Sequence, residues 1–263
     1  MKKIMTLAMA VCSMWWLPVQ ASDQQASDQQ VVRLASDFTY PPFNYKDANG
    51  QPAGFDIEIA AALCQAANFK CEWTTQDWDG LIPALLARKS DVIMASMRIT
   101  EERKKRILFT NKYYQTPARF VAKSNADFTM DVSGLTGKNI GVQIGTIHDN
   151  YVTEKFGDVA NIKRYKGQDE VYLDLESGRL DAAFGNADQL QLAFLDKPLG
   201  KGFALVGAPV TDKAYVGEGT ALALRKQDKK LAEAFNKAIA EIRQNGTYDK
   251  IASKYFNFDI YGE

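Results

Sequence analysis

The sequence predicts an α/β protein built as two lobes, and two patterns carry this prediction. Apolar strands alternate with amphipathic helices over residues 31–96, an order typical of a parallel sheet with right-handed crossovers. The same alternation starts again near residue 118, so the chain contains two such units. It crosses between them near 113–119 and returns near 215–222. Two sheets joined by only two crossings predict a clamp whose lobes move relative to each other.

Hydrophobic spacing predicts the elements of the first unit. The helix expected over residues 54–69 places Phe55, Ile59, Leu63 and Ala66 on one face. The other elements expected here are strands over 31–36, 70–75 and 91–96 and a helix over 79–90. We therefore assign residues 31–116 and 217–263 to lobe I.

Residues 117–216 form the predicted lobe II. Its expected strands are 118–124, 139–145, 162–166 and 181–186, and its expected helices are 148–156, 168–178 and 187–195. Two helices follow in lobe I, over 229–246 and 247–256. The first places Leu231, Phe235, Ala238 and Ile242 on one face. Thr247 is the expected cap of the second.

The first 21 residues have the pattern of a cleaved signal peptide. A basic start, "MKK", precedes the apolar run "IMTLAMAVCSMWWL", and the small-residue site "VQA" ends at Ala21. Cys12 follows Val11 rather than a small residue, which argues against lipid attachment. The polar leader over 22–30 is expected to be disordered. We therefore expect an exported protein in the periplasm of a Gram-negative bacterium.

Composition and charge narrow the class of partner. The chain is 46% hydrophobic and 24% charged, as is usual for a globular domain. Loss of Lys2 and Lys3 with the signal peptide leaves 30 basic residues against 32 acidic ones. This balance predicts neither a nucleic acid nor an anionic membrane as partner. No later apolar stretch is long enough to span a bilayer.

Cysteine and histidine usage limits the covalent and metal chemistry. Cys64 and Cys71 remain in the mature chain, and export favours a disulfide between them over two buried thiols. Closing so short a loop contributes roughly 2–3 kcal/mol. With His148 as the single histidine, we expect no zinc site of the usual kind, no other metal and no cofactor.

Catalytic motifs are absent from the sequence. It contains no G-x-S-x-G, Walker A, H-E-x-x-H or C-x-x-C pattern. A catalytic triad would need His148, which has no nucleophile beside it in sequence. We expect His148 to be a polar residue in a first helical turn, and the chain to be a binding protein rather than an enzyme.

Four loops that follow predicted strands indicate a binding site. They are "SDFTYPPF", "ASMRIT", "GVQIGT" and "FGNAD". Ligands of α/β sheets collect beyond the carboxyl ends of strands, where loops and helix N-termini meet. These loops combine acidic, basic, hydroxyl and aromatic residues, so together they predict a cleft for a zwitterionic small molecule.

Six segments extend the prediction of a binding cleft: "YPPF", "GFDIEIAAALC", "DWDGLIPAL", "ITEERKKRILFT", "GVQIGT" and "NGTYDKIASKYFNF". Together they resemble the periplasmic amino-acid-binding proteins of ABC transporters, in particular the lysine/arginine/ornithine- and histidine-binding group of solute-binding protein family 3. The resemblance covers the whole mature chain. It implies a type II, Venus-flytrap fold with two hinge crossings. It also implies a monomer that delivers a basic amino acid to an inner-membrane ABC permease.

The resemblance also implies a binding site. Arg103 matches an arginine that binds the ligand α-carboxylate with its planar fork. Asp37 matches an acidic residue that faces the terminal cation of a basic ligand. The other expected contacts are Ser96 at the head group, Thr146 at the carboxylate, Tyr40 and Trp78 along the side chain, and Ala95 and Gln143. Asp56 is expected either to assist through water or to cap a helix.

Two positions depart from the pattern of the family. Arg98 stands where a small residue, often serine, is usual, and Asn186 stands where an aspartate usually receives the α-ammonium. Asparagine can accept a hydrogen bond but brings no counter-charge. These changes make the head-group end more positive by about two charges, which matters in a buried site.

Two hypotheses explain the departures. In the first, which needs fewer assumptions, Arg98 turns outward to Glu101 or Glu102, Asp188 replaces the missing aspartate, and the ligand is an ordinary basic amino acid. In the second, Arg98 binds a second carboxylate and Asn186 meets a substituted nitrogen. An opine such as octopine or nopaline fits the second hypothesis, as does an N-acylarginine with an acidic tail.

Other functions on the same scaffold stay open at this point. An enzyme would need an acid or base in the cleft, and Glu218 or Asp37 are the candidates. A signalling role, in which the loaded clamp docks on a receptor, is a further alternative that the sequence does not separate from transport.

Overall fold

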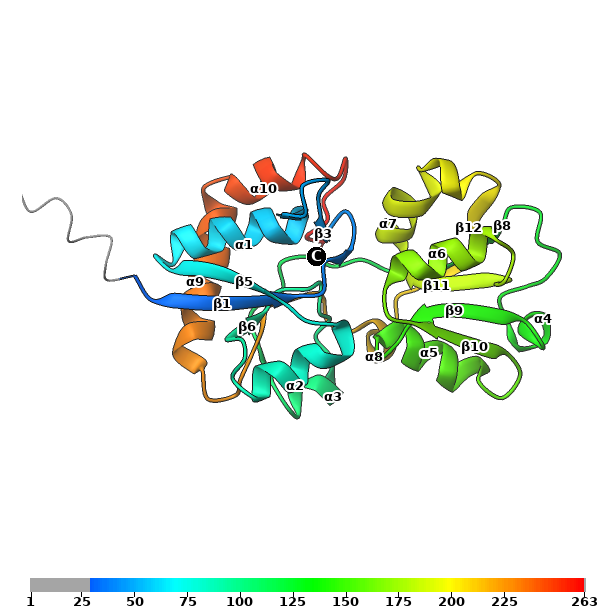
Figure 1. The fold of residues 1–263 in the computed structure, drawn as a ribbon, viewed down its shortest axis with the longest axis horizontal. Coiled ribbons are helices and arrows are strands. Elements are labelled where there is room, and N and C mark those ends of the chain that lie inside the picture. Colours follow the sequence, from blue (N-terminus) through cyan, green and yellow to red (C-terminus); the bar gives the residue numbers. More distant parts are fainter. Residues whose placement is uncertain (1–28, 263) are drawn as a thin grey trace, which may run out of the picture.

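The computed structural model describes residues 29–262, and two lobes lie side by side in it, each with its own β-sheet (Figure 1). The expected signal peptide, residues 1–21, lies outside the described residues, as does most of the expected leader, 22–30. The predicted two-lobed α/β fold is confirmed.

The sheet of lobe I has the strand order β5-β1-β6-β13-β7. Its strands are β1 (Val31–Ser36), β5 (Lys70–Thr75), β6 (Val92–Ile93), β7 (Leu108–Phe109) and β13 (Ala223–Leu224). β1 runs parallel to β5 and β6, whereas β13 runs antiparallel to β6 and β7. The parallel order expected from the sequence therefore holds for three of the five strands.

Helices cover both faces of this sheet because residues along β1 alternate between two cores. Val32 and Leu34 pack with the helices α1 (Phe55–Ala66), α9 (Lys229–Gln244) and α10 (Thr247–Ala252). Ala35 packs on the opposite face with α2 (Leu81–Leu86), which follows the 3-10 turn η1 (Trp78–Gly80). Figure 1 shows α1 and α10 on one side of β1 and α2 on the other.

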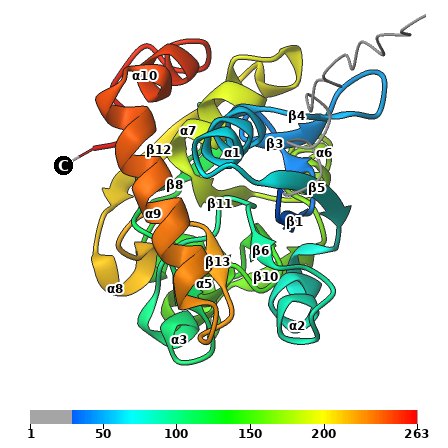
Figure 2. The ribbon, with the colours of Figure 1, turned by 90° about the vertical axis from the view of Figure 1, so that its left-hand side faces the viewer.

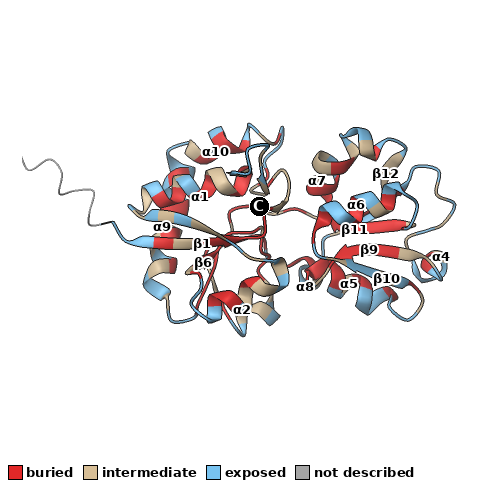
Figure 3. Ribbon diagram, viewed as in Figure 1, coloured by how far each residue is buried: buried red, intermediate tan, exposed pale blue. Residues whose placement is uncertain are grey.

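The long helix α9 follows the predicted amphipathic pattern. Phe235, Ala238 and Ile242 are buried, and Leu231 is partly buried against the same core. Figure 2 shows α9 running across the outer end of lobe I beside α1, and Figure 3 shows the fold coloured by burial. The spacing of the apolar residues therefore orients this helix correctly.

The sheet of lobe II has the order β10-β9-β11-β8-β12. Its strands are β8 (Ala118–Lys123), β9 (Asn139–Gln143), β10 (Asn161–Tyr165), β11 (Ala182–Asn186) and β12 (Phe203–Val210). One face packs on α5 (Ile147–Phe156), and the other packs on α6 (Gln168–Glu176), α7 (Ala187–Leu190) and the π-helical turn η2 (Gln191–Leu195). The short helices α4 (Val132–Leu135) and α8 (Lys213–Val216) lie in the same lobe.

The two sheets share one topology, and the crossings explain it. In each sheet, three parallel strands are followed by an antiparallel strand. This antiparallel strand, β13 in lobe I and β8 in lobe II, is the first one after a crossing from the other lobe. The crossing segments also pair with each other. Tyr113 N donates to Thr220 O at 2.8 Å, and Thr220 N donates to Tyr114 O at 2.8 Å.

Three local predictions need correction. The strand expected over 91–96 is only β6, which ends at Ile93, and Ser96 has a left-handed φ of 54° that no extended strand allows. The helix expected over 187–195 divides into α7 and η2. Thr247 does not cap α10: Gly246 is the cap residue, with φ 77°, and the Asn245 side chain accepts from Thr247 N at 3.0 Å. The hairpin of β2 (Thr39–Tyr40), β3 (Asn44–Lys46) and β4 (Pro52–Ala53) was not predicted.

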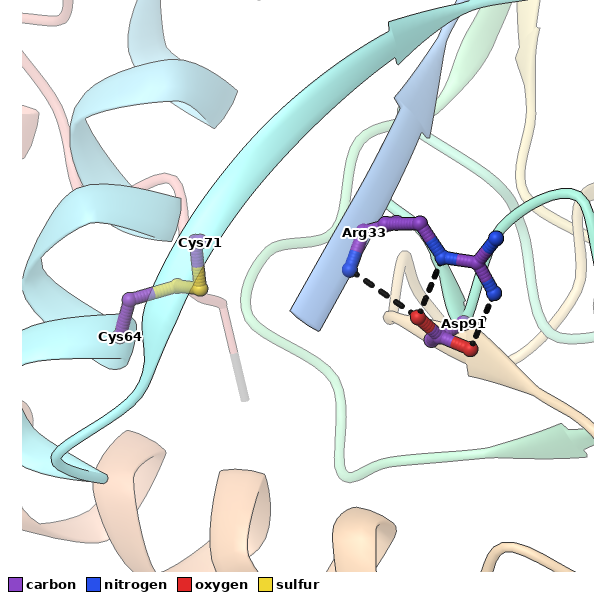
Figure 4. The surroundings of a disulfide bond; sticks show 4 residues. All are labelled: Arg33, Cys64, Cys71 and Asp91. Carbon is purple, nitrogen blue, oxygen red and sulfur yellow. Dashed lines mark hydrogen bonds and ion pairs between the residues drawn. A yellow bond between two sulfur atoms is a disulfide. The ribbon is translucent and has the colours of Figure 1, made fainter. Parts of the chain in front are cut away.

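Covalent and ionic links hold the strands of lobe I. The expected disulfide joins Cys64 at the end of α1 to Cys71 on the edge strand β5, with a Cα–Cα distance of 6.2 Å (Figure 4). In the same region, Arg33 Nε donates to Asp91 Oδ2 at 2.9 Å and Arg225 Nη2 donates to Asp91 Oδ1 at 3.1 Å. Burial raises the pKa of Asp91, but these hydrogen bonds outweigh it and set the pKa at about 2.

The part of the chain that the structure describes contains neither a candidate membrane-spanning helix nor a candidate metal site. Between residues 29 and 262, no helix is long and apolar enough to cross a membrane. Over the same residues, no group of three or more His, Cys, Asp or Glu side chains is arranged to hold a metal ion.

Candidate ligand-binding site

A small cavity lies where the lobes meet. Its lining from lobe I is Asp37, Tyr40, Trp78, Ala95, Ser96, Arg98 and Arg103. Its lining from lobe II is Gln143, Thr146, Ile147 and His148. Nine of the ten residues predicted to contact a ligand are thus brought to one cavity, and Asn186 is the exception.

The sheets position these side chains through the carboxyl ends of their parallel strands. Asp37 directly follows β1, Ser96 follows β6, and Gln143 is the last residue of β9. Thr146 caps α5, the helix that follows β9: its Oγ1 accepts from Asp149 N at 3.1 Å and donates to Gln143 O at 2.8 Å. Both lobes therefore present strand ends and a helix start to the same space.

One end of the cavity is acidic. The Asp37 carboxylate is buried, and its Oδ2 accepts from Thr39 Oγ1 at 2.9 Å and from Gln143 Nε2 at 3.1 Å. Its Oδ1 is buried without a partner among the described residues. Burial raises the pKa of Asp37, the hydrogen bonds from Thr39 and Gln143 oppose this rise, and no cation among the described residues supplies a counter-charge. A ligand cation would supply one.

The other end carries Arg103 in a fixed position. Thr100 caps the short helix α3 (Glu101–Lys104) by accepting from Arg103 N at 3.2 Å, and Arg103 Nη1 donates to the carbonyl of Arg98 at 3.0 Å. The guanidinium lies 5.4 Å from the ring centroid of Trp78. Burial, followed by repulsion from Arg98, lowers the pKa of Arg103 to about 10, so it stays cationic at neutral pH.

Ser96 is held by Asp56. Ser96 Oγ donates to Asp56 Oδ2 at 2.8 Å, and the same carboxylate accepts from Asn44 Nδ2 at 2.9 Å and from Tyr113 OH at 2.8 Å. Asp56 is not the cap of α1, which is Gly54, so the cap interpretation is wrong. Asp56 does not line the cavity; it positions the hydroxyl that does. Burial raises its pKa to about 6.

Arg98 points inward. The residue is only 4% exposed, and its Nη2 donates to the carbonyl of Thr116 at 2.7 Å and to Thr116 Oγ1. The guanidinium lies 5.8 Å from the ring centroid of Tyr114. The hypothesis that Arg98 pairs outward with Glu101 or Glu102 is therefore wrong. The backbone explains the direction, since Arg98 pairs with Thr220 of the return crossing.

Asn186 lies behind the cavity rather than in its wall. Its Oδ1 caps α7 by accepting from Asp188 N at 3.0 Å and Gln189 N at 3.2 Å, and its Nδ2 donates to Thr116 Oγ1 at 2.6 Å. Asp188 does not line the cavity either. Burial raises the pKa of its carboxyl group and the charge of Arg98 opposes this rise, so Asp188 lies near Arg98 without reaching the cavity wall. Thr116, which connects Arg98 to Asn186, was not found from the sequence because it lies in a crossing segment.

His148 is a second residue that sequence reasoning missed. It does lie in the first turn of α5, as expected, but it also lines the cavity. Its ring meets Phe184 edge-on at 5.7 Å, and its Nε2 is buried without a partner among the described residues. Burial, Arg98 and Arg103 lower its pKa to about 3, so the imidazole is neutral. Its position two residues after Thr146, a predicted contact residue, is the sequence signal that could have placed it at the cavity.

Contacts between the lobes show that the clamp is closed in this structure. Trp78 Nε1 donates to Gly145 O at 3.2 Å, Gln143 reaches Asp37, and Lys166 Nζ lies 3.6 Å from Asp77 Oδ2. Glu218, a candidate for catalysis in the enzyme alternative, is exposed, pairs with Lys104 Nζ at 2.6 Å and does not line the cavity.

Comparison with known proteins agrees with this geometry. The chain matches the family described as bacterial extracellular solute-binding proteins, family 3, over residues 32–258. It is 44% identical to the L-arginine-binding protein of Pseudomonas aeruginosa over 263 residues, covering 100% of this chain and 99% of that one. It is 42% identical to the lysine/arginine/ornithine-binding periplasmic protein of Escherichia coli over 244 residues, covering 92% and 94%. Among solved structures, an ancestral arginine-binding protein bound to arginine is similar with a TM-score of 0.80 and 36% identity, covering 87% of this chain and 99% of that one.

Proposed function

The chain belongs to the bacterial extracellular solute-binding proteins, family 3, and from this premise we propose that it captures basic amino acids or their derivatives outside the cytoplasm. It then delivers them to an ABC permease of the inner membrane. Relatives named for binding arginine, lysine and ornithine support this ligand class.

The opposite charges of Arg103 and Asp37 in the lining of one cavity carry the proposal. Arg103 offers a planar cationic fork to a carboxylate, and Asp37 offers an unpartnered carboxylate oxygen to a cation. Tyr40 and Trp78 line the cavity and provide apolar contact for an alkyl stem. A molecule with an acidic head and a basic side chain satisfies all three features at once.

Capture works by closure. We take the lobes as residues 31–116 with 217–263, and residues 117–216, with the crossings near 113–119 and 215–222 as the hinge. A ligand that touches both lobes favours the closed form by the difference between its affinities for the closed and open forms. The closed monomer, in the periplasm after removal of residues 1–21, is the form that the permease recognises.

Calorimetric titration tests the proposal. The mature protein, refolded free of ligand, should bind at least one of L-arginine, L-ornithine, L-lysine and octopine, and should not bind L-glutamate. Arg103→Ala should weaken binding at least 100-fold, because it removes the fork and leaves a buried carboxylate unpaired. Arg106→Ala, at a neighbouring exposed arginine, is the matched control. Absence of binding to every cationic compound would refute the function.

We propose binding without catalysis. The cavity lining contains one imidazole and one carboxylate, and the hydroxyl that is hydrogen-bonded to this carboxylate, Thr39 Oγ1, does not line the cavity. Ligand recovered unchanged after prolonged incubation, as judged by mass spectrometry, is the expected result. Conversion of the ligand would favour the enzyme alternative instead.

A further inference from the structure

Two buried polar atoms at the Arg103 end of the cavity have no partner among the described residues. They are Arg98 Nη1 and His148 Nε2, in residues that are 4% and 9% exposed. Both residues line the cavity. A buried polar group without a partner is costly, so this pair indicates that a ligand atom completes the site.

Both atoms suit an acceptor of hydrogen bonds. A guanidinium can only donate hydrogen bonds. Arg98 Nη2 donates to Thr116, whereas Nη1 has no acceptor among the described residues. The neutral imidazole of His148 donates from Nε2 in the tautomer that carries its proton there. Arg103 has its own fork for one carboxylate, so Arg98 and His148 await a second acceptor.

The charge at this end disfavours a free ammonium group. Arg98 and Arg103 bring two positive charges, and Asp37, which Gln143 holds, is the one carboxylate among the described residues that line the cavity. Asp188 interacts with the charge of Arg98 from outside the lining. Asp56 is near but already accepts from three side chains. An α-ammonium would therefore lie beside Arg98 without an acidic partner in the cavity wall at this end.

We propose that the site selects a ligand with two acidic groups at its head and a cation at its tail. Arg103 binds one carboxylate, Arg98 Nη1 and His148 Nε2 bind the second, and Asp37 binds the cation. The matching chemical class is an arginine- or ornithine-like molecule whose α-nitrogen carries a short substituent with a carboxylate. This inference rests on the proposed function and names the ligand class for the same cavity.

Three arginine compounds separate the contributions. Octopine carries a second carboxylate on the α-nitrogen, L-arginine carries a free α-ammonium, and Nα-acetyl-L-arginine carries neither. In calorimetry on the ligand-free mature protein, octopine should bind at least 10-fold more tightly than both others. L-Arginine binding as tightly as octopine, or more tightly, would overturn the inference while leaving the proposed function intact. Failure of all three to bind, together with ornithine and lysine, would overturn both.

Variants test the assigned residue. Arg98→Ser should weaken octopine binding at least 10-fold and leave L-arginine binding unchanged or tighter, and adding Asn186→Asp should shift the preference further to L-arginine. Arg106→Ser is the matched exposed control and should leave the preference unchanged. Equal losses for octopine and L-arginine in Arg98→Ser would count against the inference. Thermal melting checks folding, and the preference of the unaltered protein decides the matter if the variant does not fold.

Discussion

Asp56 illustrates how one buried carboxylate can serve a binding site without facing it. It holds Ser96 Oγ at 2.8 Å and Tyr113 OH at 2.8 Å, so it links the strand end that lines the cavity to the crossing segment. Burial of this carboxylate away from water has an electrostatic cost for folding, which appears as a pKa raised to about 6. The charged form is therefore less stable in the folded protein than in the unfolded chain.

This cost predicts a pH dependence of stability. The folded pKa of Asp56 lies above the ordinary value of about 3.9, so the native state binds more protons than the unfolded chain between about pH 4 and 6. The contribution of Asp56 to stability is thus most favourable below this range and falls by about 3 kcal/mol as the pH rises through it. Urea unfolding should show that the free energy of unfolding of the unaltered protein, relative to Asp56→Asn, falls by about that amount between pH 4 and pH 7. A difference that stays constant would contradict the assignment.

At the scale of elements, α1 and the edge strand β5 depend on each other. β5 pairs with only one strand, β1, and the Cys64–Cys71 bridge fixes it to α1. The bridge lies outside the cavity lining, so it contributes to the stability of lobe I and not to the chemistry of the site.

Removal of the bridge should therefore separate stability from binding. The double variant Cys64→Ser, Cys71→Ser should lose about 2–3 kcal/mol of unfolding free energy, since the unfolded chain regains the freedom that the short loop removed. Its ligand affinity at 25 °C should stay within about twofold of the original. Reduction of the unaltered protein with dithiothreitol should cause the same loss, whereas the variant should not respond to it. A large loss of affinity would show that the bridge shapes the cavity.

At the scale of the whole molecule, closure depends on a few contacts between lobes. Besides the buried hydrogen bond from Gln143 Nε2 to Asp37, two exposed contacts join the lobes: the hydrogen bond from Trp78 Nε1 to Gly145 O at 3.2 Å and the Lys166–Asp77 pair, whose side chains are 80% and 65% exposed. Exposed ion pairs contribute little, so of these two exposed contacts the tryptophan hydrogen bond is the one expected to favour the closed form.

Trp78→Phe keeps an aromatic ring under Arg103 but removes the N–H donor. We expect about 3- to 10-fold weaker ligand binding, in line with about 1 kcal/mol for one hydrogen bond. Asp77→Asn is the control and should change the affinity less than twofold. Calorimetry measures both, and small-angle X-ray scattering should show a larger radius of gyration for ligand-free Trp78→Phe than for the ligand-bound protein. Equal effects of the two changes would mean that closure does not use the tryptophan contact.

Much of the fold could be predicted because its signals are local. The spacing of Phe235, Ala238 and Ile242 orients α9, and export with two cysteines predicts the disulfide. The hairpin β2–β4 and the short β6 could not be predicted, since they depend on contacts with distant segments and on the backbone of Ser96.

By itself, the sequence determined the alternation of elements, the residue types near each strand end and the unusual charge at positions 98 and 186. Only the tertiary structure decided where those side chains point. Arg98 turns inward because its backbone pairs with Thr220 and its guanidinium finds Thr116, and both partners lie in the crossing segments. His148 joins the cavity because α5 brings it there across the cleft. The physical reason is that the spacing of residues along the chain fixes periodicity, whereas the direction of a buried polar side chain is fixed by partners that folding brings from elsewhere.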